Sequence, residues 1–295
     1  MSTSSALPAA AAGTLTLGGD LTVNRLGYGA MRICGAGIWG EPADKPACLA
    51  TLRRAVELGV NFIDTADSYG PDVSEELIAE ALAPYPADLV IATKVGWTRH
   101  GAGVWQHNAS PAHIAEAVEG SLKRLRLERI DLYQLHVPDP AVSFDASMEA
   151  IVRLKEQGKV RHIGLSNVTL EHIHRAEKIT PIVSVQNRYS FSDREWDFVL
   201  DHCTAKGIAF LPWGPMAQQR KAADAVEQIA QARGVSTAVV SLAWLLRRSP
   251  VVLPIPGTGK VAHLEENVGA AGFALSDEEF ATLNAVAPRP FWLRG

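Results

Sequence analysis

The sequence predicts an α/β protein folded as a (β/α)8 barrel, and two observations support this fold class. An amphipathic helical stretch, a Gly and a short apolar run recur in that order, as in RRAVELG-VNFIDT, RLKEQG-KVRHIGLSN and HCTAKG-IAFLPW. Such alternation of helix and strand implies a parallel sheet, and eight repeats within 295 residues imply a closed barrel rather than an open sheet.

Two segments precede the first repeat. Residues 1–13, MSTSSALPAAAAG, lack the positive charge that opens a secretory signal, and we expect them to form a disordered tail. Residues 14–23, TLTLGGDLTV, place Gly-Gly between two alternating runs and predict a β-hairpin that plugs the N-terminal end of the barrel. A single barrel domain is then expected over residues 14–295.

The strand candidates end in polar, Gly or Pro residues. They cover residues 25–31, 61–66, 89–95, 130–136, 160–167, 182–187, 208–213 and 251–257. Helix start signals lie between them, such as Ser110 before Pro111, and a capping box of Ser276 with Glu279 follows the last one. Helical stretches at 224–234 and 236–249 both fall between the last two strands, and another is predicted at 276–287. Two helices are therefore extra to the repeat.

Residues 35–40, GAGIWG, match the G-x-G-x-x-G pattern of dinucleotide-binding proteins. That pattern needs a helix directly after the glycines, whereas the two prolines of the following EPADKPA delay the helix. The glycines therefore predict a flexible loop at the C-terminal rim of the barrel, which carries Trp39 towards the active site.

Composition excludes several classes of partner. The net charge of −4 gives no electrostatic reason to expect nucleic acid or an anionic membrane, and no apolar run approaches the ~20 residues that span a bilayer. The three cysteines are widely spaced and odd in number, which predicts neither disulfides nor a Cys-x-x-Cys site and favours a reducing cytoplasm. We expect a small-molecule ligand and no obligatory protein partner.

Four polar residues lie at, or shortly after, the ends of the predicted strands where such barrels place their chemistry: Asp64, Tyr69, Lys94 and His136. A lysine in the barrel mouth is costly without a carboxylate, which Asp64 on the neighbouring strand would supply. A cation beside Tyr69 is expected to lower the pKa of the phenol and make it a proton donor near neutral pH. His136 would hydrogen-bond a substrate carbonyl oxygen. The set predicts acid–base chemistry but contains no electron source.

Six motifs, in order along the chain, resemble the aldo-keto reductase superfamily, and especially its compact bacterial members, over about residues 14–287. They are NFIDTADSYG, IATKVG, DLYQLHVPDP, HIGLSN, VSVQN and IPGTGKVAHLEENVGA. The resemblance implies reduction of aldehydes and ketones by hydride transfer from NADPH, held across the rim without a Rossmann domain. It also implies that Asp64, Tyr69, Lys94 and His136 are the catalytic tetrad, with Tyr69 as the general acid.

The resemblance also implies the cofactor contacts. Ser166, Asn167 and Gln186 would hold the carboxamide, and Trp213 would stack on the nicotinamide where the family usually has Tyr. The remaining implied contacts are Gly29, Ala30, Met31, Asp64, Gly214, Met216, Gln218, Gly257, Thr258, Lys260, His263, Glu266 and Asn267. NADPH is expected over NADH. Because His263 stands where the family often has Arg, the charge facing the 2′-phosphate falls on Lys260, a point charge rather than a fork.

Four tryptophans are expected to line a mostly apolar substrate pocket: Trp39, Trp97 and Trp105 in loops after the first and third strands, and Trp292 in the C-terminal tail. An aldehyde would suit such a pocket, and pyridoxal is a candidate because some compact relatives reduce it. No metal is expected, since EHIHR (171–175) has no evident third ligand. Two alternatives stay open, a regulatory barrel that senses NADPH with little turnover and a Schiff-base aldolase using Lys94.

Overall fold

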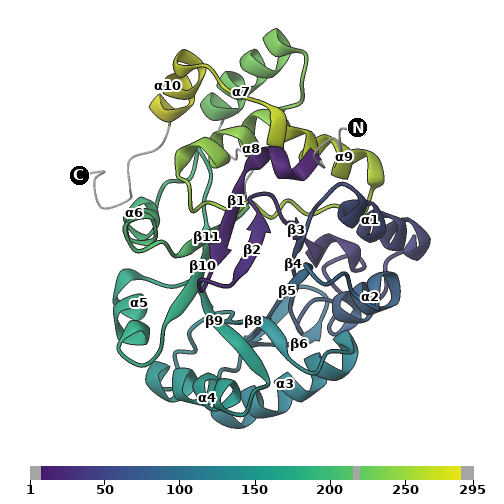
Figure 1. Cartoon of the computed structure of the whole chain (residues 1–295), viewed down its shortest axis with the longest axis vertical. Helices are drawn as coiled ribbons and strands as arrows, with labels where there is room; N and C mark the ends of the chain where they lie inside the picture. The colour runs from purple at the N-terminus through teal and green to yellow at the C-terminus, as the bar shows by residue number, and fades with distance from the viewer. Residues whose placement is uncertain (1–7, 215–219, 287–295) are drawn as a thin grey trace, which may run out of the picture.

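The computed structural model describes residues 8–214 and 220–286, and it has the predicted (β/α)8 architecture (Figure 1). Parallel strands pair around the barrel in chain order, because each is followed by a helix that returns the chain to the starting end. The strands are β3 (Tyr28–Gly29), β4 (Phe62–Asp64), β5 (Val90–Val95), β8 (Ile130–Leu135), β9 (Val160–Ser166), β10 (Ile182–Arg188) and β11 (Ala209–Trp213).

The eighth predicted strand, residues 251–257, closes the barrel without forming a regular ladder. On one side, Phe210 of β11 donates its backbone N–H to Val251 O, and Leu253 N donates to Phe210 O, both at 2.9 Å. On the other side, Gly27 N and Gly29 N donate to the carbonyls of Pro254 and Pro256. The two prolines carry no N–H and only accept, so the eighth segment is a seam rather than a full strand.

Gly29 and Gly257 face each other across this seam. A Cβ built on Gly257 would lie 2.5 Å from Gly29 O, and that neighbour is backbone and cannot turn aside. We expect Gly257→Ala to lower the free energy of unfolding by about 1–3 kcal/mol, the usual cost of overpacking. Urea unfolding measures it, with Gly269→Ala as the control because nothing lies within 4 Å of its Cβ. Equal unfolding midpoints for the two variants would contradict the steric argument.

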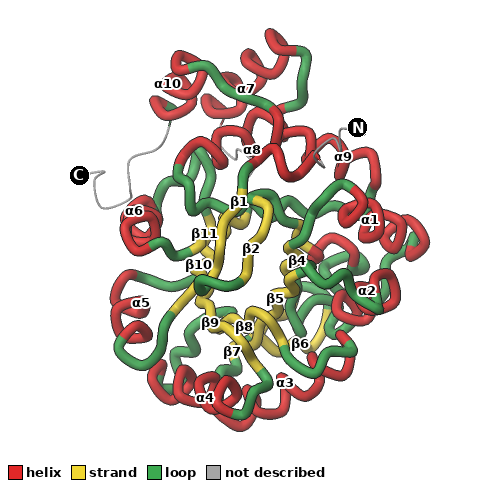
Figure 2. The backbone as a smooth tube through the Cα atoms, in the orientation of Figure 1, coloured by secondary structure: helices red, strands yellow, loops and turns green. Residues whose placement is uncertain are grey.

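Helices form a ring around the strands (Figure 2). The predicted start signals are confirmed, because Ser110 caps α3 by accepting from His113 N, and Ser276 with Glu279 forms a capping box on α10. The α-helices are α1 (Lys45–Glu57), α2 (Val73–Leu82), α3 (Pro111–Leu125), α4 (Phe144–Glu156), α5 (Leu170–Glu177), α6 (Asp197–Lys206), α7 (Arg220–Arg233), α8 (Thr237–Arg248), α9 (Val261–Gly269) and α10 (Asp277–Ala285). The described chain has ten α-helices, which agrees with the prediction of one helix for each of the eight repeats and two further helices.

The predicted N-terminal hairpin is present as β1 (Thr14–Leu17) and β2 (Leu21–Asn24), which lie across the barrel opening in Figure 1. Leu17, Leu21 and Val23 pack in one apolar cluster with the first residues of β4 and β5, Phe62 and Val90. The hairpin therefore plugs the N-terminal end of the barrel, as predicted. This leaves the C-terminal end as the open one.

Short 3-10 helices occur at η1 (Pro8–Ala12), η2 (Ala30–Ile33) and η3 (Ala270–Gly272). The first lies within the segment expected to be a disordered tail. Ala9 is fully buried and donates its backbone N–H to Leu58 O, directly after α1, and η1 also packs against η3, so the described part of that segment is ordered. Among the described residues no single helix is long and apolar enough to span a membrane, and only the bent pair 223–233 and 237–248 passes that test jointly.

One element was not predicted. Residues expected to form a loop after the third strand instead form an antiparallel hairpin, β6 (Trp97–Gly101) with β7 (Val104–His107). Gly101 pairs with Val104, so the chain reverses over the two residues between them, Ala102 and Gly103, and the positive φ of 74° at Gly103 allows this turn. The hairpin stands at the C-terminal rim and fixes Trp97 and Trp105 on facing strands, with their rings 5.8 Å apart.

Candidate active site

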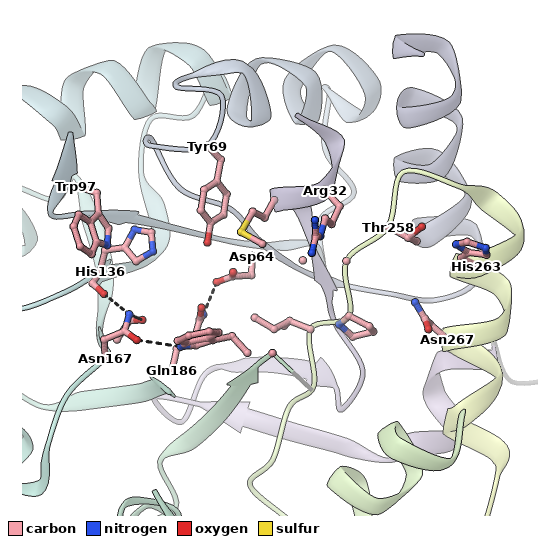
Figure 3. Close-up of a pocket in the computed structure, with 18 of the residues that line it drawn as sticks. Arg32, Asp64, Tyr69, Trp97, His136, Asn167, Gln186, Thr258, His263 and Asn267 are labelled. Carbon is pink, nitrogen blue, oxygen red and sulfur yellow. Dashed lines mark hydrogen bonds between the residues drawn. The ribbon is translucent and has the colours of Figure 1, made fainter. Parts of the chain in front are cut away.

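The C-terminal ends of three neighbouring strands bring the four predicted acid–base residues together. Asp64 ends β4, Lys94 lies near the end of β5, and His136 directly follows β8. Tyr69 comes from the turn after β4, and its ring meets the His136 ring edge-on at 5.8 Å between centroids. Figure 3 shows Tyr69 and His136 pointing into one space beside Asp64.

Lys94 is fully buried, and its ammonium has three short-range partners. Nζ donates to Asp64 Oδ2 at 2.7 Å, to Thr65 O at 2.8 Å and to Tyr69 Oη at 3.4 Å. Burial alone would lower the pKa of Lys94, but the adjacent Asp64 carboxylate and Tyr69 outweigh it, so that pKa is raised. These contacts favour the ammonium form of Lys94, whereas a Schiff-base nucleophile requires a neutral amine. The geometry therefore favours a role for Lys94 beside Tyr69 over the aldolase alternative.

Tyr69 differs from its expected electrostatics. Burial raises the pKa of the phenol, Asp64 adds to the rise, and the Lys94 cation opposes it without cancelling it. The expected net lowering was wrong because the cost of burying a phenolate exceeds the attraction of one cation that already faces a carboxylate. An ammonium only donates, so at the Lys94 contact the tyrosine oxygen accepts. Its own proton is left for a partner in the cavity.

Asp64 is held from both sides. Its Oδ2 accepts from Lys94, and its Oδ1 accepts from Gln134 Nε2 at 3.1 Å and from Gln186 Nε2 at 2.8 Å. Gln134, the residue before the last in the strand β8, was not predicted as part of the site from the sequence. Its polar side chain in an otherwise apolar buried run was the available signal, since a buried amide needs a partner.

His136 is buried and carries no charge at neutral pH. Burial, and to a smaller extent the Lys94 cation, lower the pKa of its imidazole well below the ordinary 6.5. Its backbone carbonyl accepts from Asn167 Nδ2 at 3.0 Å, which fixes the strand end, and Nδ1 has no hydrogen-bond partner within the described chain. A neutral imidazole offers one N–H donor and one acceptor nitrogen.

We expect the imidazole NMR resonances of His136 to stay constant as the pH is lowered from about 8 to about 6, a range that spans the ordinary histidine pKa. The reason is that its pKa is lowered well below 6.5, so protonation begins only in more acidic solution. Residue-specific assignment by comparison with His136→Gln identifies the signal. A titration centred near 6.5 would show that the ring is not buried as described.

A cavity of about 970 Å³ runs from these residues along the rim to α9. Figure 3 shows Tyr69 and His136 at one end and His263 and Asn267 at the other. Most residues implied for the cofactor line it: Gly29, Met31, Asp64, Ser166, Asn167, Gln186, Trp213, Gly214, Gly257, Thr258, His263, Glu266 and Asn267. Trp97 and Trp105 line it as well. An elongated cavity suits a ligand much longer than a simple aldehyde.

Four predicted residues of the described chain do not line this cavity. Lys94 is buried behind Asp64 and Tyr69, and Ala30 is buried as the first residue of η2. Trp39 lies on the outer rim with 36% of its surface exposed, and Lys260 is exposed at the start of α9. Met216, Gln218 and Trp292 lie outside the described residues. Arg32 lines the cavity and was missed, because it lies in a 3-10 helix that begins inside the predicted strand 25–31 and continues just beyond it.

The residues implied for a carboxamide form one hydrogen-bonded group. Asn167, held with a left-handed φ of 56°, donates through Nδ2 to Ser166 Oγ at 3.1 Å. Its Oδ1 accepts from Trp213 Nε1 at 3.1 Å, which orients an indole that is 38% exposed. Gln186 donates through Nε2 to Asp64, so the side-chain oxygen Oε1 of Gln186 is the atom that can accept from a ligand amide.

Arg99 links the rim segments around the cavity. Its guanidinium stacks on Trp105 at 3.8 Å and lies 5.7 Å from the Trp39 ring on the other side. The same group donates to the carbonyls of Gly37 and Ile38 in the GAGIWG loop and to Ser68 O, next to Tyr69. This packing holds Trp39 outside the cavity. It also confirms that GAGIWG is a loop, since the next helix begins only at Lys45.

A barrel that places a phenol 3.4 Å from a buried ammonium, at one end of a long rim cavity, has the arrangement of an enzyme that acts on a small polar group beside an elongated cofactor. Comparison with known proteins gives the particular family. Residues 25–288 match the model of the Aldo/keto reductase family, and the chain belongs to that family. The predicted family and reaction class are thereby confirmed.

Individual relatives agree with this assignment. An uncharacterized oxidoreductase of Schizosaccharomyces pombe is 50% identical over 283 residues, 95% of this chain and 92% of its own length. Pyridoxine 4-dehydrogenase of Escherichia coli is 42% identical over 281 residues, 93% of this chain and 98% of its own. An aldo-keto reductase of Klebsiella pneumoniae, solved in complex with NADPH, is 27% identical with a TM-score of 0.79, covering 94% of this chain and 96% of its own.

Proposed function

We propose that this protein reduces an aldehyde with Tyr69 as the proton donor. The observation that carries the proposal is the Lys94–Tyr69 contact at 3.4 Å, in which the tyrosine oxygen accepts and its proton remains available to the cavity. A bound nicotinamide cofactor supplies the hydride for the carbonyl carbon. Tyr69 then gives its proton to the carbonyl oxygen, and Lys94 stabilises the negative charge that develops on the phenol oxygen.

His136 is proposed to orient the substrate. Its lowered pKa keeps it neutral, so it can direct a ring N–H at the carbonyl oxygen without competing with Tyr69 for the role of acid. Asp64, fixed by Lys94 and by two glutamine amides, keeps the ammonium in place. Trp97 packs edge-on against His136 at 6.4 Å and limits the approach of water from that side.

The cofactor is proposed to lie along the rim cavity. Ser166, Asn167 and the Gln186 carbonyl offer the donors and acceptors that a carboxamide needs, and the exposed face of Trp213 suits stacking on the nicotinamide. At the far end, the first turn of α9 offers unpaired backbone N–H groups beside Thr258 and His263, which favours phosphate there. This placement supports NADPH over NADH.

Arg32 is proposed to bind the pyrophosphate. It lines the middle of the cavity, and Figure 3 shows it between Asp64 and Thr258, at a distance from the adenine end marked by Asn267. The structure describes no ion pair for its guanidinium, so a fork of donors is available for a phosphate oxygen. Lys260, the cation expected from sequence, is exposed and outside the cavity.

We expect Arg32→Ala to raise the dissociation constants of NADPH and NADH by similar factors, about 10-fold or more, the usual scale for a charge-assisted hydrogen bond. Both cofactors carry the pyrophosphate, so both should weaken. Fluorescence titration measures the two constants, and Lys260→Ala is the matched control, with a change of less than about 3-fold. A loss confined to NADPH would move Arg32 to the 2′-phosphate, and no loss would remove it from the site.

The substrate is proposed to be an aromatic aldehyde, with pyridoxal as the first candidate. Trp97 and Trp105 form an aromatic wall next to His136, which suits a flat ring. The name of the Escherichia coli relative says that it dehydrogenates pyridoxine, and reversal of that oxidation yields reduction of an aldehyde. A small aliphatic aldehyde covers less of this wall than a flat ring does, so small aliphatic aldehydes are expected to react more weakly.

NADPH consumption with pyridoxal, benzaldehyde and butanal tests the proposal. The expected result is turnover with all three and the highest kcat/KM for pyridoxal. A higher value for benzaldehyde would retain the aldehyde reductase and reject pyridoxal as its substrate. Saturable NADPH binding without turnover on any aldehyde would overturn the enzyme proposal in favour of the cofactor-sensing alternative.

A further inference from the structure

Helices α5 and α6 bring three metal-ligating side chains together on the outside of the barrel. His174 and Glu177 lie one turn apart on α5, and His202 comes from α6, the neighbouring helix in Figure 1. Their ligand atoms all lie within 4.8 Å of one another. His202 Nε2 is 3.3 Å from Glu177 Oε1, and the two imidazole rings are 5.0 Å apart between centroids.

We propose that this triad, His174, Glu177 and His202, is a binding site for a divalent transition metal, with Zn²⁺ as the first candidate. Two imidazoles and one carboxylate are ligands that Zn²⁺ favours, and water completes its tetrahedron. Ligand atoms about 2.0–2.1 Å from a tetrahedral ion are about 3.3 Å apart. The His202–Glu177 pair already has that spacing, and side-chain rotation of the exposed His174 brings in the third ligand.

From the sequence alone no metal is expected here, because EHIHR has no evident third ligand. The fold supplies what the local sequence lacks, since Glu177 is one turn further along α5 and His202 lies on the next helix. No arginine or lysine in the described chain is ion-paired with Glu177, whose hydrogen-bond partner is His202 itself. The carboxylate is therefore available to a cation.

The triad lies away from the rim cavity. Glu177 ends α5 and borders a shallow surface hollow together with Ile182 and Ile208, which lie at the starts of β10 and β11. The starts of the strands mark the N-terminal end of the barrel, and enzymes of this fold have their active sites at the opposite, C-terminal end. A metal at the triad would therefore tie α5 to α6 and stabilise the barrel without acting on the substrate.

The test uses the full chain, freed of metal with a chelator and then titrated with Zn²⁺. Calorimetry is expected to show one ion per chain, and thermal unfolding is expected to shift upwards in proportion to saturation, because the ion binds the folded chain better than the unfolded one. The double variant His174→Ala/His202→Ala should lose both the calorimetric signal and the shift. Aldehyde reduction by wild type should be unchanged by one equivalent of Zn²⁺.

His172→Ala is the matched control. It removes a histidine from the same helix, where it caps the N-terminus with Thr169, so it should lower the unfolding temperature while keeping the Zn²⁺-dependent rise. Stoichiometric binding that survives in the double variant would place the ion elsewhere and overturn the proposal. The absence of any binding to wild type would overturn it as well.

Discussion

Tyr69→Phe is expected to lower the turnover of aldehyde reduction by about 10²-fold or more while leaving NADPH affinity unchanged. The variant removes only the hydroxyl, the proton donor of the proposed mechanism, and that is the usual scale for such a loss. The phenyl ring keeps its edge-on contact with His136 at 5.8 Å and its place 5.0 Å below the Lys94 cation. Single-turnover oxidation of bound NADPH with pyridoxal measures the effect on the chemical step.

Tyr133→Phe provides a matched control for this prediction. Tyr133 is another buried tyrosine, on β8, and its hydroxyl has no hydrogen-bond partner among the described residues. Removing it takes away the same atoms without touching the cavity, so turnover should be unchanged. Comparable losses in both variants would mean that Tyr69→Phe acts through the fold, and full activity of Tyr69→Phe would remove Tyr69 as the acid.

Lys94→Met is expected to damage both catalysis and folding. It removes the ammonium that faces Tyr69 and leaves the Asp64 carboxylate buried without a cation, a change that typically costs about 3–5 kcal/mol. Turnover should fall by about 10²-fold or more, because the developing charge on the phenol oxygen loses its stabilising partner. Urea unfolding and single-turnover kinetics measure the two effects separately.

The double variant Asp64→Asn/Lys94→Met separates the two roles of the lysine. With both charges gone, much of the lost stability should return, since a neutral pair is less costly to bury than a lone carboxylate. Turnover should stay low, because no ammonium remains beside Tyr69. If the double variant recovered wild-type turnover, the effect of Lys94→Met would lie in folding alone.

Much of the fold could be predicted because its signals are local and repeated. Helix, Gly and apolar strand recur along the chain, and the caps at Ser110 and Ser276 form as expected. The β6–β7 hairpin escaped prediction because its runs are short and polar, although Gly-Ala-Gly between Trp97 and Trp105 is a turn signal. The prediction of the eighth strand was only partly right. Its apolar pattern indicates a strand, but Pro254 and Pro256 have no backbone N–H to donate to a neighbouring strand.

The grouping of Asp64, Tyr69, Lys94 and His136 was predictable because parallel strands end on one edge, so order along the chain gives order around the rim. The pKa of Tyr69 was not, because burial depends on everything packed around the phenol. Arg99 and the triad of His174, Glu177 and His202 depend on contacts between distant segments. Contacts of this kind produce no regular spacing of residues from which they could be predicted.

The seam between β3 and residues 251–257 makes the ring of strands incomplete at one place. Gly29 and Met31 on one side and Gly257 and Thr258 on the other all line the cavity proposed for the cofactor. A nucleotide bound there as proposed would touch both edges and bridge a joint of the barrel that has no regular ladder of hydrogen bonds. By linkage, ligand at 100 times its dissociation constant adds about 2.7 kcal/mol against opening. The resistance of this protein to cellular proteases would therefore depend on the concentration of NADPH.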